Sequence, residues 1–320
     1  MRGTLVFLIN SLFFGSAFAQ GDYPSKPIRL VVGFAAGGIS DVLARAIVVP
    51  VSKQLGQPVI VENKPGAGTT IAGDFTLKSP PDGYTLWLQD ITTHAINNTL
   101  YPKLPYDSMK DFTFIAMVAS TPLMLVVHPS TPAASVKELI ALLKAAPGKY
   151  SYGSSGNGTI VHLAGEMLRS AAGVEALHVP YKGSNPATAA ILGGEVTFVF
   201  STMPPALSST KGGKLRALAV TTPKRSGAAP EVPTMIEAGL ANFDIVLYSG
   251  ILGPRGMDRA LVRRINGEFA KAVRAAEMQQ VWQNIGADPI VMTPEEFEAA
   301  TAREIAKLAP VVKASGAKIE

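Results

Sequence analysis

The chain has 320 residues, of which 47% are hydrophobic and 17% are charged, and it contains no cysteine. So apolar a composition excludes an intrinsically disordered protein. The lack of cysteine excludes a disulfide scaffold, a thiolate metal site, an iron–sulfur cluster and a cysteine nucleophile. The net charge of +5 comes from scattered basic residues without a dense patch or tail, so nucleic acid is not expected as a partner.

The N-terminus has the features of a secretory signal peptide. Arg2 precedes a mostly apolar stretch over residues 5–14, and alanines at 17 and 19 form a cleavage pattern before Gln20. The apolar stretch is too short to cross a bilayer comfortably. We therefore expect residues 1–19 to be removed and the mature chain to be exported, with a bacterial periplasm as its destination.

Strand patterns and helix patterns alternate along the mature chain. In chain order, apolar runs predict strands at 28–34, 58–61, 84–88, 123–127, 177–179, 196–200 and 215–220. Helical patterns predict helices from Ser40 to about Gly56, from about Thr70 through Leu77, over 136–143, near 187–192, and over 257–276 and 294–313. A strand, a glycine-rich loop and a helix follow one another within 150–168. This alternation predicts an α/β fold with largely parallel sheets, in two interleaved lobes rather than two tethered ones.

Three glycine-rich loops each lie between a predicted strand and a predicted helix. They cover residues 34–41, 65–70 and 153–159. Glycine lets the backbone approach a ligand closely, and a helix start offers free N–H groups and a positive dipole end. Each loop alone is also compatible with an ordinary tight turn. Three such loops at strand ends favour a shared anion site.

Other site chemistries fit the sequence less well. The four histidines (94, 128, 162 and 178) contain no pair at metal-ligand spacing, so no metal is expected, and His162 is interpreted as a packing residue. Gly66 and Gly68 match only the start of a dinucleotide fingerprint. The third loop is no nucleophile elbow, because Asn157 occupies its final glycine position. The sequence therefore predicts no cofactor and no enzyme activity.

Motifs along the whole mature chain resemble one protein family. They are Gly37-Gly38 with Asp41, and the segments 55–68, 81–86, 106–112, 153–166, 178–183, 212–220 and 232–239. Together they are similar to the Bug family of periplasmic solute-binding proteins, which serve tripartite tricarboxylate transporters. The resemblance implies a type II periplasmic-binding-protein fold, in which two α/β lobes are joined by crossing strands with a ligand cleft between them. Lobe 1 would comprise residues 20–123 and 248–320, and lobe 2 residues 124–247.

The resemblance also implies a carboxylate ligand held by loop backbone and hydroxyl groups. Its expected site residues in the first lobe are Phe34, Ala35, Gly37, Gly38, Ile39, Ser40, Thr69, Thr70, Thr92 and His94. Those in the second lobe are Ser154, Ser155, Asn157, Thr159, Tyr181, Ser201 and Thr202. The expected partners are this small carboxylate and the membrane permease subunits, with the receptor itself a monomer.

Two positions depart from the family's usual pattern and bear on the ligand. Ile39 stands where a hydroxyl residue is frequent, and Ser201 stands where many members carry an acid that could face a ligand ammonium. Both changes favour a ligand without an amino group, either a dicarboxylate or an aromatic carboxylate. Two alternatives stay open at this point: a ligand-presenting sensor component for a membrane kinase, and a secreted enzyme that acts on a small acid.

Overall fold

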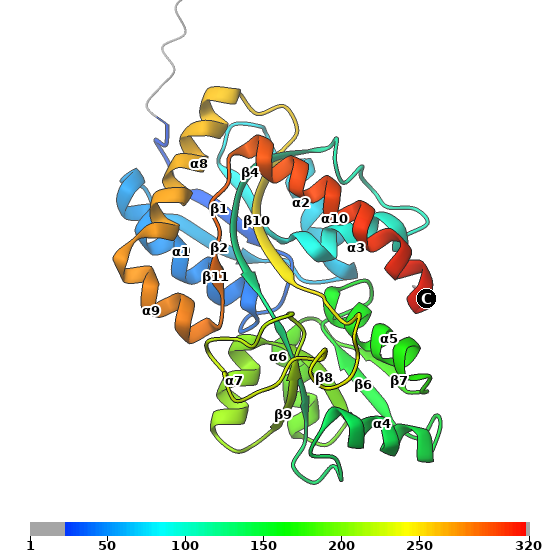
Figure 1. Ribbon diagram of the computed structural model, residues 1–320. Helices are drawn as coiled ribbons and strands as arrows, with labels where there is room; N and C mark the ends of the chain where they lie inside the picture. The colour runs from blue at the N-terminus through cyan, green and yellow to red at the C-terminus, as the bar shows by residue number, and fades with distance from the viewer. Residues whose placement is uncertain (1–22, 318–320) are drawn as a thin grey trace, which may run out of the picture.

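The computed structural model describes residues 23–317, which are built around two separate β-sheets (Figure 1). The predicted signal peptide at residues 1–19 lies outside these described residues. Among the helices of residues 23–317, none is long and apolar enough to cross a membrane. We call the two sheets with their helices the first lobe and the second lobe.

The first lobe contains a six-stranded sheet in the order β11-β4-β10-β3-β1-β2. Its strands are β1 (Ile28–Val32), β2 (Val59–Asn63), β3 (Thr85–Asp90), β4 (Phe112–Thr121), β10 (Leu247–Pro254) and β11 (Asp288–Pro289). Its helices are α1 (Ile39–Leu55), α2 (Thr70–Leu77), α3 (Ile91–Leu100), α8 (Arg259–Arg274), α9 (Ala276–Ile285) and α10 (Pro294–Ser315), with a short 3-10 turn, η1 (Ala67–Thr69).

The second lobe contains a five-stranded sheet in the order β7-β6-β8-β5-β9. Its strands are β5 (Leu123–Val127), β6 (Ser151–Ser154), β7 (Leu177–Pro180), β8 (Phe198–Thr202) and β9 (Arg216–Val220). Its helices are α4 (Val136–Ala145), α5 (Ile160–Ala172), α6 (Ser184–Leu192) and α7 (Met203–Lys211).

The two sheets share one topology. In each sheet, three strands that follow one another along the chain are parallel and lie side by side in the order second, first, third. An antiparallel strand pairs with the third of them and separates these three strands from the rest of the sheet. The antiparallel strand is β10 in the first lobe and β5 in the second. Each of these two antiparallel strands is the first strand that the chain forms after crossing from the other lobe. The type II binding-protein fold is therefore confirmed, whereas the expectation of largely parallel sheets is corrected to two mixed sheets.

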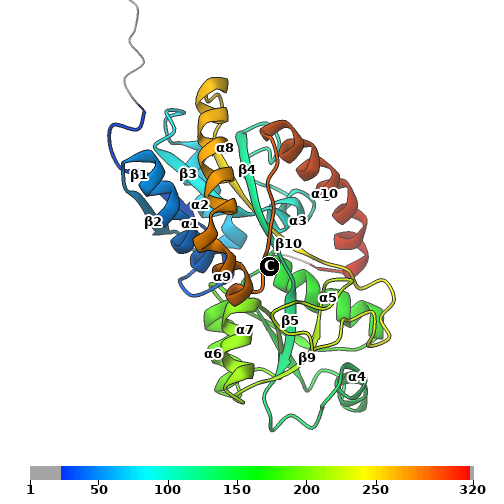
Figure 2. The same ribbon diagram turned by 60° about the vertical axis from the view of Figure 1, so that its left-hand side comes forward.

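Two crossings connect the lobes. The chain passes from β4 into β5 almost without interruption, and it returns after residue 243 into β10 (Figure 1 and Figure 2). The N–H of Leu123 donates to Oγ1 of Thr221 at 2.9 Å, and the N–H of Thr221 donates to the carbonyl of Leu123 at 3.1 Å. These bonds tie the outgoing crossing to the residue after β9, and the N–H of Ile245 in the returning crossing donates to the carbonyl of the same Thr221 at 3.2 Å. The residue boundaries of the lobes stay a prediction.

Several elements differ from the sequence prediction for local reasons. The helix predicted over 257–276 ends at Arg274, because Ala275 has an extended ψ of 142° before α9 begins. β10 has a weak strand signal because it contains two glycines and ends at a proline. A Cβ on Gly250 would lie 2.4 Å from the ring of Phe297, so packing requires glycine at this position.

Candidate functional site

The amino ends of three helices meet where the two lobes face each other. Helices α1, α6 and α7 follow Gly38, Gly183 and Thr202, and none of these residues caps its helix with a side-chain hydrogen bond. A Cβ built on Gly38 would lie 3.9 Å from the backbone nitrogen of Ser184 and 4.0 Å from Oγ1 of Thr202. Uncapped helix starts present free N–H groups and positive dipole ends. Pro204 and Pro205 carry no N–H, so the start of α7 contributes its dipole end and at most the N–H of Met203. Their meeting point is therefore favourable for an anion.

The hydroxyl of Thr202 is unpaired at this point. Thr202 is 4% exposed, and within residues 23–317 its Oγ1 has no hydrogen-bond partner. A buried polar atom without a partner is costly and uncommon in native proteins. The Oγ1 of Thr202 is therefore available to a ligand carboxylate or to a water.

A small enclosure surrounds this hydroxyl, and we call it the inner cavity. Its free volume is about 10 Å³, room for about one water. Its wall combines apolar side chains with hydroxyl groups and one carboxyl group. The lining residues are Phe34, Gly38, Ile39, Ser40, Asp90, Ser155, Ile160, Val161, Ser184, Thr202 and Leu247.

A second hollow, the outer cavity, adjoins the inner one and shares Phe34 and Ser155 with it. It has a volume of about 230 Å³ and is formed mainly by the second and third glycine loops. Its other lining residues are Gly33, Gly66, Ala67, Gly68, Thr69, Gly156, Asn157, Pro180, Tyr181 and Lys182. The inner and outer cavities together form the interlobe cleft.

Side chains of the first lobe hold the first glycine-rich loop (residues 34–41) in place. The N–H of Gly37 donates to Oδ2 of Asp41 at 3.1 Å, and Nδ2 of Asn63 donates to the carbonyl of Phe34 at 2.9 Å. Burial favours the neutral form of Asp41, but hydrogen bonds from Arg45, Asn63 and Gly37 outweigh it and lower the pKa of this carboxyl. The ionised Asp41 therefore holds the loop in place before any ligand arrives.

The second loop stores backbone strain. Thr69 has a φ of +76°, which is rare for a β-branched residue. Its Oγ1 accepts a hydrogen bond from Nε2 of Gln89 at 2.7 Å, and Nδ2 of Asn97 donates to the carbonyl of Gly68 at 2.7 Å. Such strained positions concentrate at ligand sites, and here the surrounding amides hold the loop in its shape.

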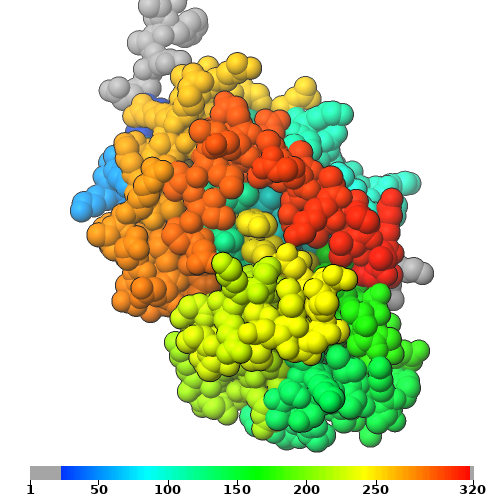
Figure 3. Space-filling view, in the orientation of Figure 1, coloured from blue at the N-terminus to red at the C-terminus, as the bar shows by residue number. Residues whose placement is uncertain are grey.

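The lobes are in direct contact across the cleft. The N–H of Ala35 donates to the carbonyl of Lys182, and the N–H of Ile160 donates to Oγ1 of Thr93, both at 3.0 Å. The space-filling view of the side that bears α10 shows the green and yellow atoms of the second lobe against the orange and red atoms of the first (Figure 3). The structure therefore represents a closed conformation.

The structure brings nine of the seventeen predicted site residues to the cleft lining. These are Phe34, Gly38, Ile39, Ser40, Thr69, Ser155, Asn157, Tyr181 and Thr202. Ala35 and Gly37 lie beside the cleft at the contact between the lobes, where Ala35 bonds to Lys182 and a Cβ on Gly37 would meet Asn185.

The other six predicted residues do not line the cleft, because their side chains have partners elsewhere. The ring of His94 bonds through Nε2 to the carbonyl of Ser108 and packs among Trp87, Tyr106 and Phe112. Burial lowers the pKa of His94 to about 4. The hydroxyls of Thr70, Thr92, Ser154, Thr159 and Ser201 bond to Ala67, Val246, His178, Gly156 and Thr188, respectively.

Sequence reasoning missed several residues of the inner cavity, of which Asp90 matters most for electrostatics. Asp90 is the N-cap of α3 and accepts hydrogen bonds from the N–H and Oγ1 of Thr93. The available sequence signal was an acidic residue that follows an apolar strand and precedes a threonine by three residues. This pattern is typical of a helix N-cap. Ser184 and Leu247 carried no comparable signal, since only the folded chain brings them to the cavity.

Burial raises the pKa of Asp90 from 3.8 to about 7. A raised carboxyl pKa means that the folded state favours the protonated form, so the stability it contributes is fully present below about pH 3.8 and is lost as the pH rises to about 7. Asp90→Asn keeps an acceptor for Thr93 and cannot ionise. We expect this variant to raise the melting temperature more at pH 8 than at pH 5, as measured by calorimetry. An equal difference at both pH values would show that burial does not raise the pKa of Asp90 above about 5 in the folded state.

A larger hollow lies away from this cleft. It has a volume of about 580 Å³ and is bounded by α5, α10 and residues 239–243. None of the three helix starts that face one another at Gly38 borders it. We therefore place the candidate site in the interlobe cleft rather than in this larger groove.

Comparison with known proteins identifies the family of this chain. A family model described as the tripartite tricarboxylate transporter family receptor matches residues 43–317. The chain belongs to this family. Members of this family are periplasmic solute-binding receptors and not enzymes, so the receptor is a binding protein.

Individual relatives cover almost the whole receptor. It is 36% identical over 299 residues to protein BugT of Bordetella pertussis, which covers 93% of this chain and 92% of BugT. The structure of Rpa4515 from R. palustris with adipate is 33% identical, with a TM-score of 0.90, and the match covers 93% of this chain and 100% of that one. MatC from Rhodopseudomonas palustris with bound malate is 29% identical, with a TM-score of 0.85 over 91% of this chain and 100% of that one.

Proposed function

We propose that the receptor captures a small dicarboxylate in the interlobe cleft and presents it to the permease subunits of a tripartite tricarboxylate-type transporter. The observation that carries this proposal is the meeting of the uncapped starts of α1, α6 and α7 around the unpaired Oγ1 of Thr202. Donors fixed by the backbone bind a carboxylate without the entropy cost of ordering a long side chain.

The two cavities would bind different ends of the ligand. One carboxylate would bind at the helix starts of the inner cavity, against Gly38 and Ser184, where no lysine or arginine lines the wall. The second polar end would reach the outer cavity, which offers Thr69, Tyr181 and Lys182. Adipate and malate, the acids in the two related structures, are both dicarboxylates.

An aromatic carboxylate also belongs to the proposed ligand range. Ile39 lines the inner cavity together with Ile160 and Leu247, and these side chains suit an apolar ligand body. Ser201 does not bear on the choice of ligand, because its Oγ bonds to Oγ1 of Thr188 at 2.8 Å in the core.

Ligand entry requires the lobes to separate, since the closed inner cavity has room for about one water. Opening would break the bond from Ala35 to Lys182 and the bond from Ile160 to Thr93. The crossings near Leu123 and Ile245 would absorb the hinge motion. We propose lobe boundaries at 123/124 and 247/248, as the sequence predicts.

The cellular setting follows the family. We propose that residues 1–19 are a signal peptide and that the mature receptor acts in the periplasm as a monomer, as the sequence predicts. The test is a thermal-shift screen with malate, adipate, terephthalate and glutamate. An acid at about 100 times its dissociation constant adds roughly 2.7 kcal/mol of stability. A shift with a dicarboxylate and none with glutamate is expected; a shift with glutamate alone would overturn the proposed ligand class.

A further inference from the structure

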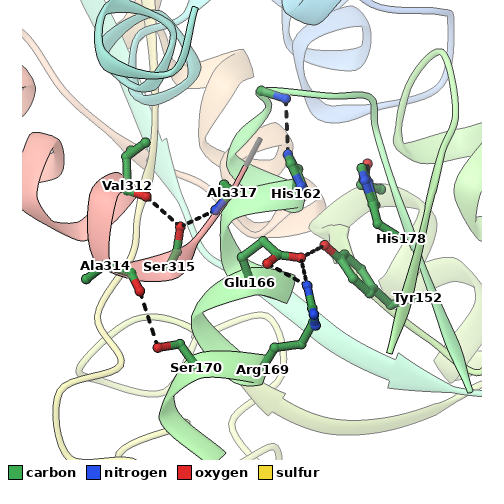
Figure 4. A network of polar contacts seen from close by, with 12 residues as sticks. Tyr152, His162, Glu166, Arg169, Ser170, His178, Val312, Ala314, Ser315 and Ala317 are labelled. Atoms are coloured by element: carbon green, nitrogen blue, oxygen red, sulfur yellow. Dashed lines mark hydrogen bonds and ion pairs between the residues drawn. The ribbon is translucent and has the colours of Figure 1, made fainter. Parts of the chain in front are cut away.

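Two histidines of the second lobe form a stacked pair beside the third glycine loop. The rings of His162 on α5 and His178 on β7 lie with centroids 4.0 Å apart and planes 6° from parallel (Figure 4). Asn157 lines both the outer cavity and a neighbouring hollow that contains both rings. The pair is therefore next to the cleft without lining it.

Each ring holds one part of the loop. The N–H of Gly158 donates to Nδ1 of His162 at 3.2 Å. The N–H of Gly156 donates to Oγ of Ser154 at 3.1 Å, and this Oγ lies 2.6 Å from Nε2 of His178. Since Nδ1 of His162 accepts a bond, its neutral ring carries the proton on Nε2. Gly156 and Gly158 have φ values of +127° and +77°, which glycine adopts readily, so the bonds to Ser154 and His162 select one of several accessible loop conformations.

The groups around the pair favour neutral rings. Glu166, on the same helix as His162, is shared by the guanidinium of Arg169 at 2.7 Å and by the hydroxyl of Tyr152 (Figure 4). Burial lowers the pKa of His162, Arg169 lowers it further, and Glu166 opposes both. Burial, with smaller contributions from His162 and Arg169, lowers the pKa of His178 to about 3. Tyr152 on β6 stacks against His178 at 4.9 Å.

We propose that His162 and His178 are positioning residues whose neutral rings hold residues 154–158 in the conformation that binds the ligand, so that acidification releases this loop and weakens binding. The inference rests on the proposed function for its ligand. A proton on Nδ1 of His162 would face the N–H of Gly158 and abolish that bond. An imidazolium would also lie against its stacked partner and near Arg169, where its charge is disfavoured.

The sign of the pH effect follows from proton linkage. Both rings have a lower pKa in the ordered loop than the ordinary value of about 6.5, so the released loop binds more protons. The ordered loop is fully favoured above about pH 6.5 and loses stability as the pH falls below it. Each histidine can contribute up to about a tenfold loss of affinity per pH unit. Protonation of Asp90 on acidification has the opposite effect on ligand affinity, because it removes a negative charge beside the anion site.

Matched variants separate the pair from every other titrating group. His162→Asn places an amide oxygen where Nδ1 lies, so it keeps an acceptor for Gly158 and cannot titrate; His162→Leu removes the acceptor. His178→Gln keeps a polar atom for Ser154 in the same way. His128 near Ser130 is the control position, because it lies outside the pair. Asp90 and the ligand carboxyls titrate identically in all of these variants.

The experiment measures adipate and malate affinity by calorimetry at pH 7.5 and pH 5.5 in each variant. We expect wild type and His128→Asn to lose affinity about tenfold or more on acidification. The double variant His162→Asn/His178→Gln should bind with the wild-type affinity at pH 7.5. Its loss of affinity at pH 5.5 should be at least threefold smaller than the loss in the wild type. His162→Leu should bind weakly at both pH values. Superimposable pH profiles of the wild type and the double variant would overturn the proposal.

A second readout needs no ligand and separates this inference from the proposed function. Amide hydrogen exchange of Gly156 and Gly158, measured by NMR, should lose protection below about pH 6.5 in the wild type and keep it in the double variant. Unchanged protection in both proteins would overturn the loop-positioning role. Failure of both acids to bind at pH 7.5, with the exchange pattern as expected, would instead contradict the proposed ligand class.

Discussion

Gly38→Asp is expected to abolish carboxylate binding while the receptor stays folded. The new carboxylate would project toward the backbone nitrogen of Ser184 and Oγ1 of Thr202, the donors proposed for the ligand. It would occupy the inner cavity and repel a ligand carboxylate in a poorly solvated place. We expect affinity for adipate or malate to fall by about 100-fold or more in calorimetry, on the order of 3 kcal/mol.

Gly38→Ala is the matched control for this variant. Gly38 has a φ of −80°, which any residue adopts, and an added methyl group would meet its neighbours only at ordinary contact distances of 3.9 Å or more. We expect Gly38→Ala to fold normally and to lose about tenfold or less in affinity. A folded Gly38→Asp protein with unchanged affinity would show that the first loop is not the anion site.

Thr202→Val is expected to stabilise the ligand-free receptor and to weaken ligand binding. Valine has the shape of threonine without the unpaired buried hydroxyl, so about 1 kcal/mol or more of desolvation cost disappears. A hydrogen bond to a charged ligand contributes about 1.5–3 kcal/mol, so its loss lowers affinity about 10- to 150-fold. Denaturant unfolding and calorimetry measure the two effects on the same preparation.

Ser201→Ala is the control for Thr202→Val. Ser201 precedes Thr202 on β8, but its Oγ bonds to Thr188 within the core. We expect its loss to lower the free energy of unfolding by about 1 kcal/mol and to leave affinity unchanged. If Thr202→Val lowered stability without changing affinity, the hydroxyl would have a structural role and no place in the ligand site.

The local parts of this account were predictable from the sequence. Gly37-Gly38, between a β-branched apolar run and a helix that ends at Gly56, predicted the first loop and the start of α1 within one residue. The run at 123–127 predicted β5 with its observed bounds. These predictions succeed because turn glycines, helix ends and apolar periodicity depend on neighbouring residues.

The parts set by tertiary packing were not predictable. His94 lies one turn into α3, after a strand and near the site in sequence, yet its ring packs against Tyr106 and Phe112. Nothing local distinguishes that outcome from a ligand contact. The same is true of Ser184, which reaches the cavity only because α6 begins opposite Gly38. The convergence of three helix starts is a property of two folded lobes in contact.

The most direct test of the central claim is a crystal structure of the receptor with a bound dicarboxylate. The account predicts one carboxylate within hydrogen-bonding distance of the backbone nitrogen of Ser184 and of Oγ1 of Thr202, beside Gly38. A dicarboxylate bound in the groove between α5 and α10, with the inner cavity still closed around an unpaired Thr202, would contradict it.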